Sequence, residues 1–215
     1  MVVLKNVDII HAKNTAFSIL MEKGNFIHSI DHALRVHDNA MLIFMEIRER
    51  CVKKMISLKL ASYWHDTGKD DCRENEDVPH NIISAELFKD YAVEKGILND
   101  ISEMAQSIIL CHRNRGKKYY RSPSSDEEKV LWDADKLDIV NSIRITEIVW
   151  AYLNGYKVGE FNLKDTISFW MSISPEFANK FYFKISQEIF YDRYSKFRQS
   201  VEKIYSNIIE NNIYV

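Results

Sequence analysis

Apolar residues recur along the chain with the three- and four-residue spacing of amphipathic helices. From Ile30 to Ile47 they form one stripe, which predicts a helix with a buried face. A second helix is expected from about Lys53 to His65, with Gly68 as its stop signal. Pro79 suits the start of a third helix, because proline is favoured in the first helical turn.

The same pattern continues through the second half of the chain. Residues Ile101 to Leu110 are expected to be helical, ending near His112. The segment Ser125-Asp126-Glu127-Glu128 has the Ser-x-x-Glu form of a capping box. It predicts a helix that extends through Asp135 towards Trp150, and a last long helix is expected from about Pro175 to Ile209. We therefore expect an all-α protein.

Two charged segments interrupt the helical pattern. Asp70 to Asp77 is acidic, and Arg113 to Ser125 is basic, aromatic and rich in turn residues, so both are predicted to be loops. Gly155 and Gly159 bound a further connection. Because no convincing linker is present, we expect one domain over residues 1–215. Its motif-bearing core would span about 26–140, with the helices of about 141–210 packed on it.

Composition narrows the class of protein. Gly and Pro are scarce, at 6 and 3 of 215 residues, which favours long helices. The 29 basic and 31 acidic residues nearly balance, which argues against a nucleic-acid coat or a polybasic membrane binder. The chain has three cysteines but no CxxC motif, and it shows neither a signal-peptide pattern nor an apolar run of roughly 18–20 residues. These features favour a soluble, cytoplasmic protein.

Potential metal ligands lie at three places in the predicted helices. His65 and Asp66 end an apolar helix just before Gly68, where a frayed end can turn both side chains towards one ion. His32 lies among core-facing residues. Asp133, Asp135 and Asp138 fall within six residues, and two carboxylates two residues apart face different ways on a helix. At most one of Asp133 and Asp135 should therefore face a given ion, and imidazole with carboxylate suits Mn²⁺, Fe²⁺, Co²⁺, Ni²⁺ or Zn²⁺.

These elements, in this order, resemble the H…HD…D signature of the HD-domain superfamily of metal-dependent phosphohydrolases. The flanks Asp-His-Ala-Leu-Arg-Val, His-Asp-Thr-Gly-Lys and Asp-Ala-Asp-Lys-Leu-Asp resemble those of small stand-alone bacterial members. The family's last ligand follows an alanine, which selects Asp135 over Asp133. His80, His112, Phe181 to Lys184 and Arg193 also match, so the resemblance covers roughly residues 26 to 200.

The resemblance implies a single-domain helical bundle of the HD type that hydrolyses a phosphate ester or anhydride, with a nucleotide as the expected substrate. The implied metal ligands are His32, His65, Asp66 and Asp135. The ion would be Mn, Fe, Co, Ni, Zn or Mg and would lower the pKa of a bound water, with Asp66 as the base. Lys69, Arg35 and Arg115 would neutralise phosphate charge.

His80 and His112 have two possible roles. They could bind a second ion bridged by Asp66, or they could contact the substrate phosphate. A second ion normally needs more than two added ligands, so we favour one ion, with both histidines as phosphate contacts.

Other interpretations remain open. The chain could be a catalytically silent HD module that binds a nucleotide or a protein partner, a di-iron oxygenase on the same fold, or a hydrolase of the (p)ppGpp type. The basic loop 113–121 is expected to attract phosphates more than nucleic acid. His28 either lines the pocket or caps a helix, Asp133 and Asp138 either support a ligand or lie at the surface, and the sequence leaves the oligomeric state open.

Overall fold

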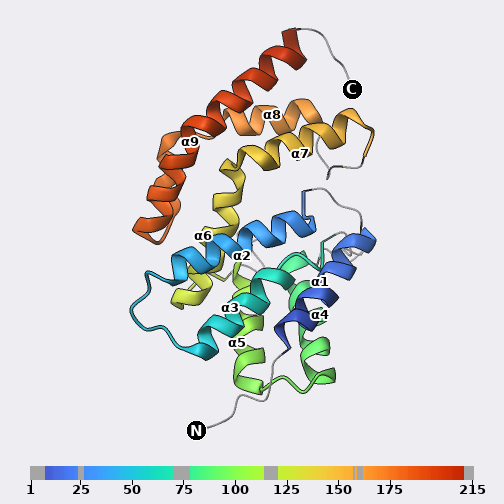
Figure 1. Cartoon of the computed structure of the whole chain (residues 1–215), viewed down its shortest axis with the longest axis vertical. Coiled ribbons are helices and arrows are strands. Elements are labelled where there is room, and N and C mark those ends of the chain that lie inside the picture. The colour runs from blue at the N-terminus through green and yellow to red at the C-terminus, as the bar shows by residue number, and fades with distance from the viewer. Residues whose placement is uncertain are drawn as a thin grey trace.

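The computed structural model describes residues 8–23, 27–69, 78–113, 121–156, 158 and 162–210. Within these ranges all regular structure is helical, which confirms the all-α prediction (Figure 1). The α-helices are α1 Ile9–Lys23, α2 Ile30–Phe44, α3 Val52–Trp64, α4 His80–Glu94, α5 Asn99–Cys111, α6 Asp126–Leu137, α7 Ser142–Leu153, α8 Leu163–Met171 and α9 Lys184–Tyr205. Short turns of 3₁₀ helix cover Asp138–Val140 and Pro175–Lys180, and a π-helical turn covers Ser206–Glu210.

The first five helices and α6 enclose the larger part of the core. α3 packs against α1, α2 and α5, while α2 also packs against α6, and α4 against α5. Trp64 and Phe88 are fully buried there, with their rings 5.5 Å apart. α1 was not expected from the sequence; it packs on α3, and Trp64 Nε1 donates a hydrogen bond to the Ala12 carbonyl at 3.1 Å.

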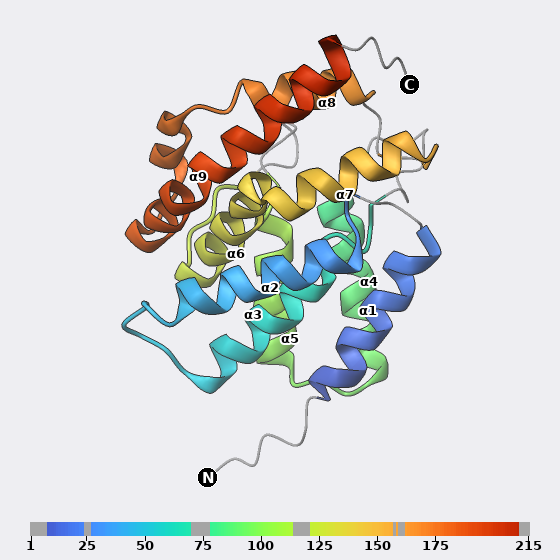
Figure 2. The same cartoon turned by 45° about the horizontal axis from the view of Figure 1, so that its top comes forward.

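The last three helices lie at the other end of the molecule, with α6 between the two groups (Figures 1 and 2). α9 packs on α6, α7 and α8, and it buries Phe190 and Phe197 completely. The buried apolar side chains form one cluster that runs from Ala12 to Ile208. This packing is compatible with one domain, which stays a prediction.

Two predicted helices are shorter than expected, and α8 was not anticipated. The helix that opens with the Ser125 capping box ends at Leu137 instead of continuing towards Trp150. Asn141 starts a new helix because its Oδ1 accepts the Ile143 N–H at 2.9 Å. The last helix was expected from Pro175, yet Pro175–Lys180 is 3₁₀ and α9 begins only at Lys184. The chain between them is held by Asp133, which accepts the Tyr182 and Phe183 N–H groups at 3.0 and 3.1 Å.

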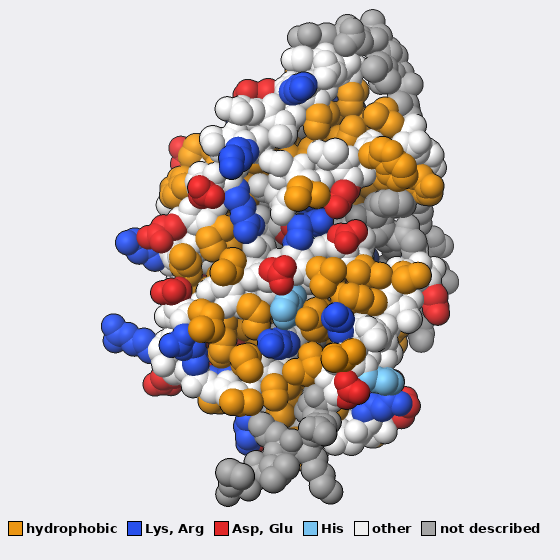
Figure 3. All heavy atoms as spheres, viewed as in Figure 1, with side chains coloured by type: hydrophobic (Ala, Val, Ile, Leu, Met, Phe, Trp, Pro, Cys, Tyr) orange, Lys and Arg blue, Asp and Glu red, His pale blue; other side chains and the backbone are white. Residues whose placement is uncertain are grey.

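The surface agrees with a nearly balanced charge. On the face in Figure 3, Lys and Arg side chains are interspersed with Asp and Glu. Among the helices described, none is both long and apolar enough to cross a membrane.

Candidate metal centre

The His65–Asp66 turn is set by a close approach between the end of α3 and the start of α4. A Cβ on Gly68 would lie 2.5 Å from both the His80 carbonyl oxygen and the Ser84 nitrogen, so only glycine fits without a shift of the backbone. The Gly68 N–H donates to Ser84 Oγ at 2.8 Å. This contact places His80, the first residue of α4, beside Asp66.

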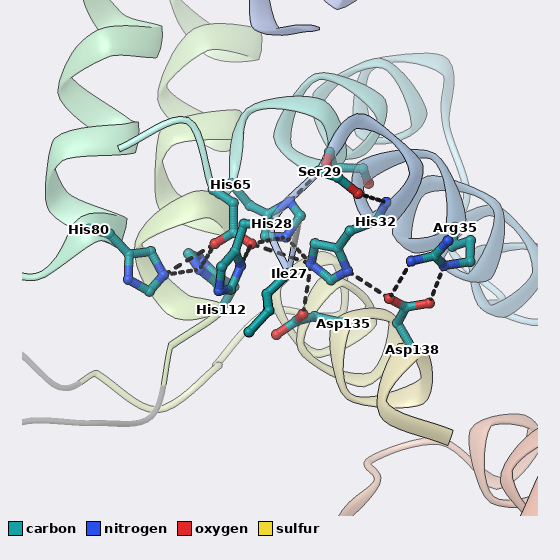
Figure 4. Close-up of polar contacts among 12 residues, drawn as sticks. Ile27, His28, Ser29, His32, Arg35, His65, His80, His112, Asp135 and Asp138 are labelled. Atoms are coloured by element: carbon teal, nitrogen blue, oxygen red, sulfur yellow. Dashed lines mark hydrogen bonds and ion pairs between the residues drawn. The ribbon is translucent and has the colours of Figure 1, made fainter. Parts of the chain in front are cut away.

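Two buried histidines present their Nε2 atoms to the same point from α2 and from the end of α3 (Figure 4). His65 Nδ1 donates to the Ser62 carbonyl at 2.8 Å, and His32 Nδ1 donates to Asp138 Oδ2 at 2.7 Å. Because Nδ1 carries the hydrogen in each case, the lone pair of the neutral ring is on Nε2. The two Nε2 atoms are 3.2 Å apart, as two ligands of one ion require.

Asp66 lies between two pairs of histidines. Its Oδ2 is 3.3 Å from the Nε2 atoms of both His32 and His65. Its Oδ1 is 3.2 Å from His80 Nε2 and 3.4 Å from His112 Nε2. One carboxylate therefore faces two sets of imidazole nitrogens at once.

Asp135 completes the first set from α6. Its Oδ1 is 3.4 Å from His32 Nε2, while Lys136 contacts its Oδ2. Asp133, two residues earlier on α6, instead bonds to the backbone of Tyr182 and Phe183. The two carboxylates thus face different ways, as their spacing on the helix requires.

The side chains fit a metal ion. Three overlapping groups have ligand atoms within 4.8 Å of one another: His32, His65 and Asp135; Asp66, His80 and His112; and His28, His32 and Asp66. Most of these residues are buried, unlike ordinary clusters of surface acids. Mixed imidazole and carboxylate donors suit a divalent transition metal.

The protonation of these groups follows from burial and mutual contact. For Asp66 and Asp135, burial favours the neutral acid, but the adjacent charges outweigh it, chiefly those of His28 and His65 at Asp66 and of Lys136 and His32 at Asp135. The pKa of each carboxyl is therefore well below its usual range. For His32, burial and the Arg144 charge lower the pKa, yet its hydrogen bonds to Asp135, Asp138 and Asp66 outweigh both and raise it to about 10. The ring is therefore protonated on both nitrogens, and an ion bound at Nε2 would displace the proton there.

His80 and His112 are held in different tautomers. His112 Nδ1 donates to the Ile109 carbonyl at 2.6 Å, so its Nε2 presents a lone pair. The Arg113 guanidinium donates to His80 Nδ1 at 3.3 Å, so the hydrogen of neutral His80 is on Nε2, 3.0 Å from His112 Nε2. Burial lowers the pKa of His112, and it lowers that of His80 to about 3, so both rings are neutral.

The remaining predicted site residues do not all face this cluster. Arg35 lies beyond Asp138 in Figure 4, donating to Asp138 Oδ1 at 2.7 Å and to Glu147 Oε2 at 3.0 Å. Lys69 follows the ligand turn directly, and its N–H donates to the Asp66 carbonyl at 2.9 Å. Burial is the main reason that the pKa values of His28 and His80 are lowered, and the Lys69 charge adds to it. Arg115, the acidic segment 70–77 and most of the basic loop fall outside the described residues.

Three residues lie near the proposed ligands; the sequence left two roles open for each of His28 and Asp138 and gave none for Arg144. His28 Nδ1 is 2.5 Å from Asp66 Oδ2, and its side chain is 19% exposed. Its position one turn before His32 was the only sequence signal for it. Asp138 is fully buried against His32, and Arg144 donates to Asp138 at 3.1 Å. No local motif marks Arg144.

The fold and this cluster define an all-α protein with a buried histidine–carboxylate centre of the metal-binding kind. The sequence model of the HD domain matches residues 29–139, more than half of the chain. The chain therefore belongs to the HD domain family, whose members are generally metal-dependent hydrolases.

Several solved structures share the fold. A predicted HD superfamily hydrolase from an uncultured Thermotogales bacterium is 20% identical, covering 93% of this chain and 91% of that one, with a TM-score of 0.59. Bacillus subtilis YpgQ in complex with ADP is 16% identical, covering 94% and 98%, with a TM-score of 0.64. The Lin1889 protein from Listeria innocua is 16% identical, covering 91% and 92%, with a TM-score of 0.61. No curated protein sequence matches the chain.

Proposed function

We propose that the protein is a metal-dependent phosphohydrolase that acts on a phosphate ester or anhydride, with a nucleotide as substrate. The observation that supports the proposal is the convergence of buried His32, His65 and Asp66 with partly buried Asp135, with the Nδ1 atoms of both histidines already bonded. Membership of the HD domain family supports the reaction class. The ADP complex of YpgQ, a protein of similar fold, supports a nucleotide.

The four ligands would hold one divalent ion, and Asp66 would have a second task. A divalent ion bound there would lower the pKa of water and polarise a phosphoryl oxygen. Oδ2 of Asp66 faces His32 and His65, where the ion would bind, while Oδ1 faces His80 and His112. Oδ1, the oxygen that would not bind this ion, could then accept a proton from the attacking water.

We favour one ion because only the first set has the hydrogens of both neutral imidazole rings on the nitrogens that face away from the ion. In the first set, the hydrogen bonds of His32 and His65 direct Nε2 lone pairs to a common point. In the second set, His112 offers a lone pair but His80 offers an N–H. A second ion would require His80 to change tautomer and give up its contact with Arg113. His80 is better prepared to donate a hydrogen bond to a phosphate.

Phosphate charge would be balanced by side chains near the cluster. Lys69 fits this role through its proximity to His28 and His80. Arg35 fits this role less well than its sequence position suggested, because its guanidinium is already paired with Asp138 and Glu147. We therefore assign Lys69 to the phosphate and Arg35 to the support of Asp138.

The test is release of phosphate or pyrophosphate from a panel of nucleoside mono-, di- and triphosphates, with Mn²⁺, Co²⁺, Ni²⁺ or Mg²⁺ added. We expect metal-dependent turnover of at least one nucleotide, and a loss of about 100-fold or more in Asp66→Asn, which loses both a ligand and a base. Asp38→Asn is the matched control, since Asp38 is exposed and pairs only with His37 among the described residues. Tight nucleotide binding without turnover would instead favour a binding module, and turnover that consumes O₂ would favour an oxygenase.

A further inference from the structure

Asp138 connects a proposed metal ligand to two arginines. It lies in the 3₁₀ turn after α6 and is fully buried. Its Oδ2 accepts hydrogen bonds from His32 Nδ1 at 2.7 Å and from Arg144 at 3.1 Å. Its Oδ1 accepts from Arg35 Nε at 2.7 Å (Figure 4). The carboxylate thus joins α2, α7 and the end of α6.

Both arginines are themselves fixed by a second acceptor. Arg35 also pairs with Glu147 at 3.0 Å, and Arg144 also donates to the Ile27 carbonyl at 3.3 Å. A buried carboxylate is costly unless its oxygens are fully bonded, and here all the bonds come from held donors. The position of Asp138 is therefore closely determined.

His32 differs in this respect from His65 and His112. His65 and His112 donate Nδ1–H to backbone carbonyls, of Ser62 and Ile109. His32 donates to a charged carboxylate. A carboxylate acceptor raises the basicity of an imidazole ligand more than a neutral carbonyl does and fixes its ring orientation.

We infer that Asp138 is a positioning residue for metal binding: it holds His32 with Nε2 towards the cluster, while Arg35 and Arg144 hold Asp138. The inference rests on the proposed metal site and adds a residue that touches neither ion nor substrate. Among the described residues, the side-chain hydrogen bonds of Asp138 come from His32 and the two arginines, so His32 is its direct contact with the proposed ligands.

The test compares two buried aspartates that lie five residues apart. Asp138→Asn keeps the size of the side chain but removes the charge opposite His32. Asp133→Asn makes the same change at a carboxylate whose hydrogen bonds, among the described residues, come from the backbone of Tyr182 and Phe183. Circular dichroism and Tm report folding, chelator competition gives the Co²⁺ dissociation constant, and the visible spectrum of bound Co²⁺ reports ligand geometry.

We expect Asp138→Asn to weaken Co²⁺ binding about 10- to 100-fold and to alter the Co²⁺ spectrum. Asp133→Asn should leave the Co²⁺ dissociation constant within twofold of the wild-type value and the Co²⁺ spectrum unchanged. We expect this even if its Tm falls as much as that of Asp138→Asn. Equal effects of the two variants would mean a merely structural role and would overturn the inference, as would unchanged binding in folded Asp138→Asn. If Asp138→Asn does not fold, Arg144→Gln replaces it, with an expected loss of several-fold, and unchanged binding there overturns the inference. Wild-type protein that binds no Co²⁺ would instead refute the proposed metal site itself.

Discussion

At the scale of single residues, the tautomers of four histidines decide what the cluster can do. His32, His65 and His112 each have a bonded Nδ1–H, so the neutral form of each ring offers an inward lone pair, whereas neutral His80 has an inward N–H. Three of the rings are thus prepared as ligands and one as a donor. This difference cannot be read from residue types, because all four are histidines beside carboxylates.

The difference leads to unequal predictions for two substitutions. His80→Ala should keep one ion per chain and lose about 100-fold in kcat/KM, because it removes a hydrogen bond to the phosphate. His112→Ala should also keep the ion but lose less, because neutral His112 lacks an inward N–H. Metal content by elemental analysis and steady-state kinetics check both. A fall from two ions per chain to one in either variant would support the two-ion alternative.

At the scale of elements, the contact between the end of α3 and the start of α4 is as important to the cluster as the proposed ligands. The Gly68 contact explains why His80 lies beside Asp66 although 14 positions separate them in the chain. The sequence shows a glycine shortly after the end of α3. It does not show that a second helix passes so close.

Gly68→Ala should therefore damage both stability and metal binding. Its Cβ would lie 2.5 Å from two backbone atoms of α4, so the helices must separate, at a cost of about 1–3 kcal/mol. Gly96→Ala is the matched control, since Gly96 has a φ of +62° and nothing within 4 Å of the added Cβ. It should cost about 1–2 kcal/mol from backbone strain alone and leave metal affinity unchanged. Equal metal affinity in the two variants would contradict this account of the contact between α3 and α4.

The start of α6 gives a prediction for pH. Burial favours neutral Glu128, but bonds from Ser124, Ser107 and Arg121 outweigh it and lower the pKa of Glu128 from 4.5 to about 2. The folded pKa is below the unfolded one, so the stabilisation is complete above about pH 4.5 and is lost as pH falls towards 2. Glu128→Gln should have a lower Tm than wild type at pH 7, and the difference should shrink over this window. Glu188→Gln, at an exposed pair on α9, should show little difference at any pH.

Local sequence signals predicted some elements well and others poorly, for physical reasons. The Ser125 capping box is a contact between residues three apart, and it is present as predicted. The break at Asn141 was missed because apolar residues continue on both sides of it, at Val140 and Ile143. The bond between His32 and Asp138 spans 106 positions, so no local pattern can reveal that Arg35 is drawn away from the metal cluster.

At the scale of the whole molecule, α6 carries Asp135 on one side and supports α9 on the other. Asp133 holds the chain just before α9, and Asp135 faces the cluster. The buried apolar side chains of both ends belong to one cluster. A substitution that destabilises the C-terminal helices should therefore also destabilise the N-terminal helices, which contain most of the proposed metal centre.

Phe190→Ala tests this coupling directly. Phe190 is fully buried and stacks with Phe177 and Tyr194, so its removal should cost about 3–5 kcal/mol. If the chain is one cooperative domain, thermal unfolding is a single transition. The variant then lowers the free energy of opening of the N-terminal helices by as much as that of α9. Amide hydrogen exchange resolved along the sequence measures both parts at once. Val93→Ala, at an exposed position of α4, is the control and should change neither. Unchanged protection of α2 and α3 in Phe190→Ala would show two independent units and refute the single-domain prediction.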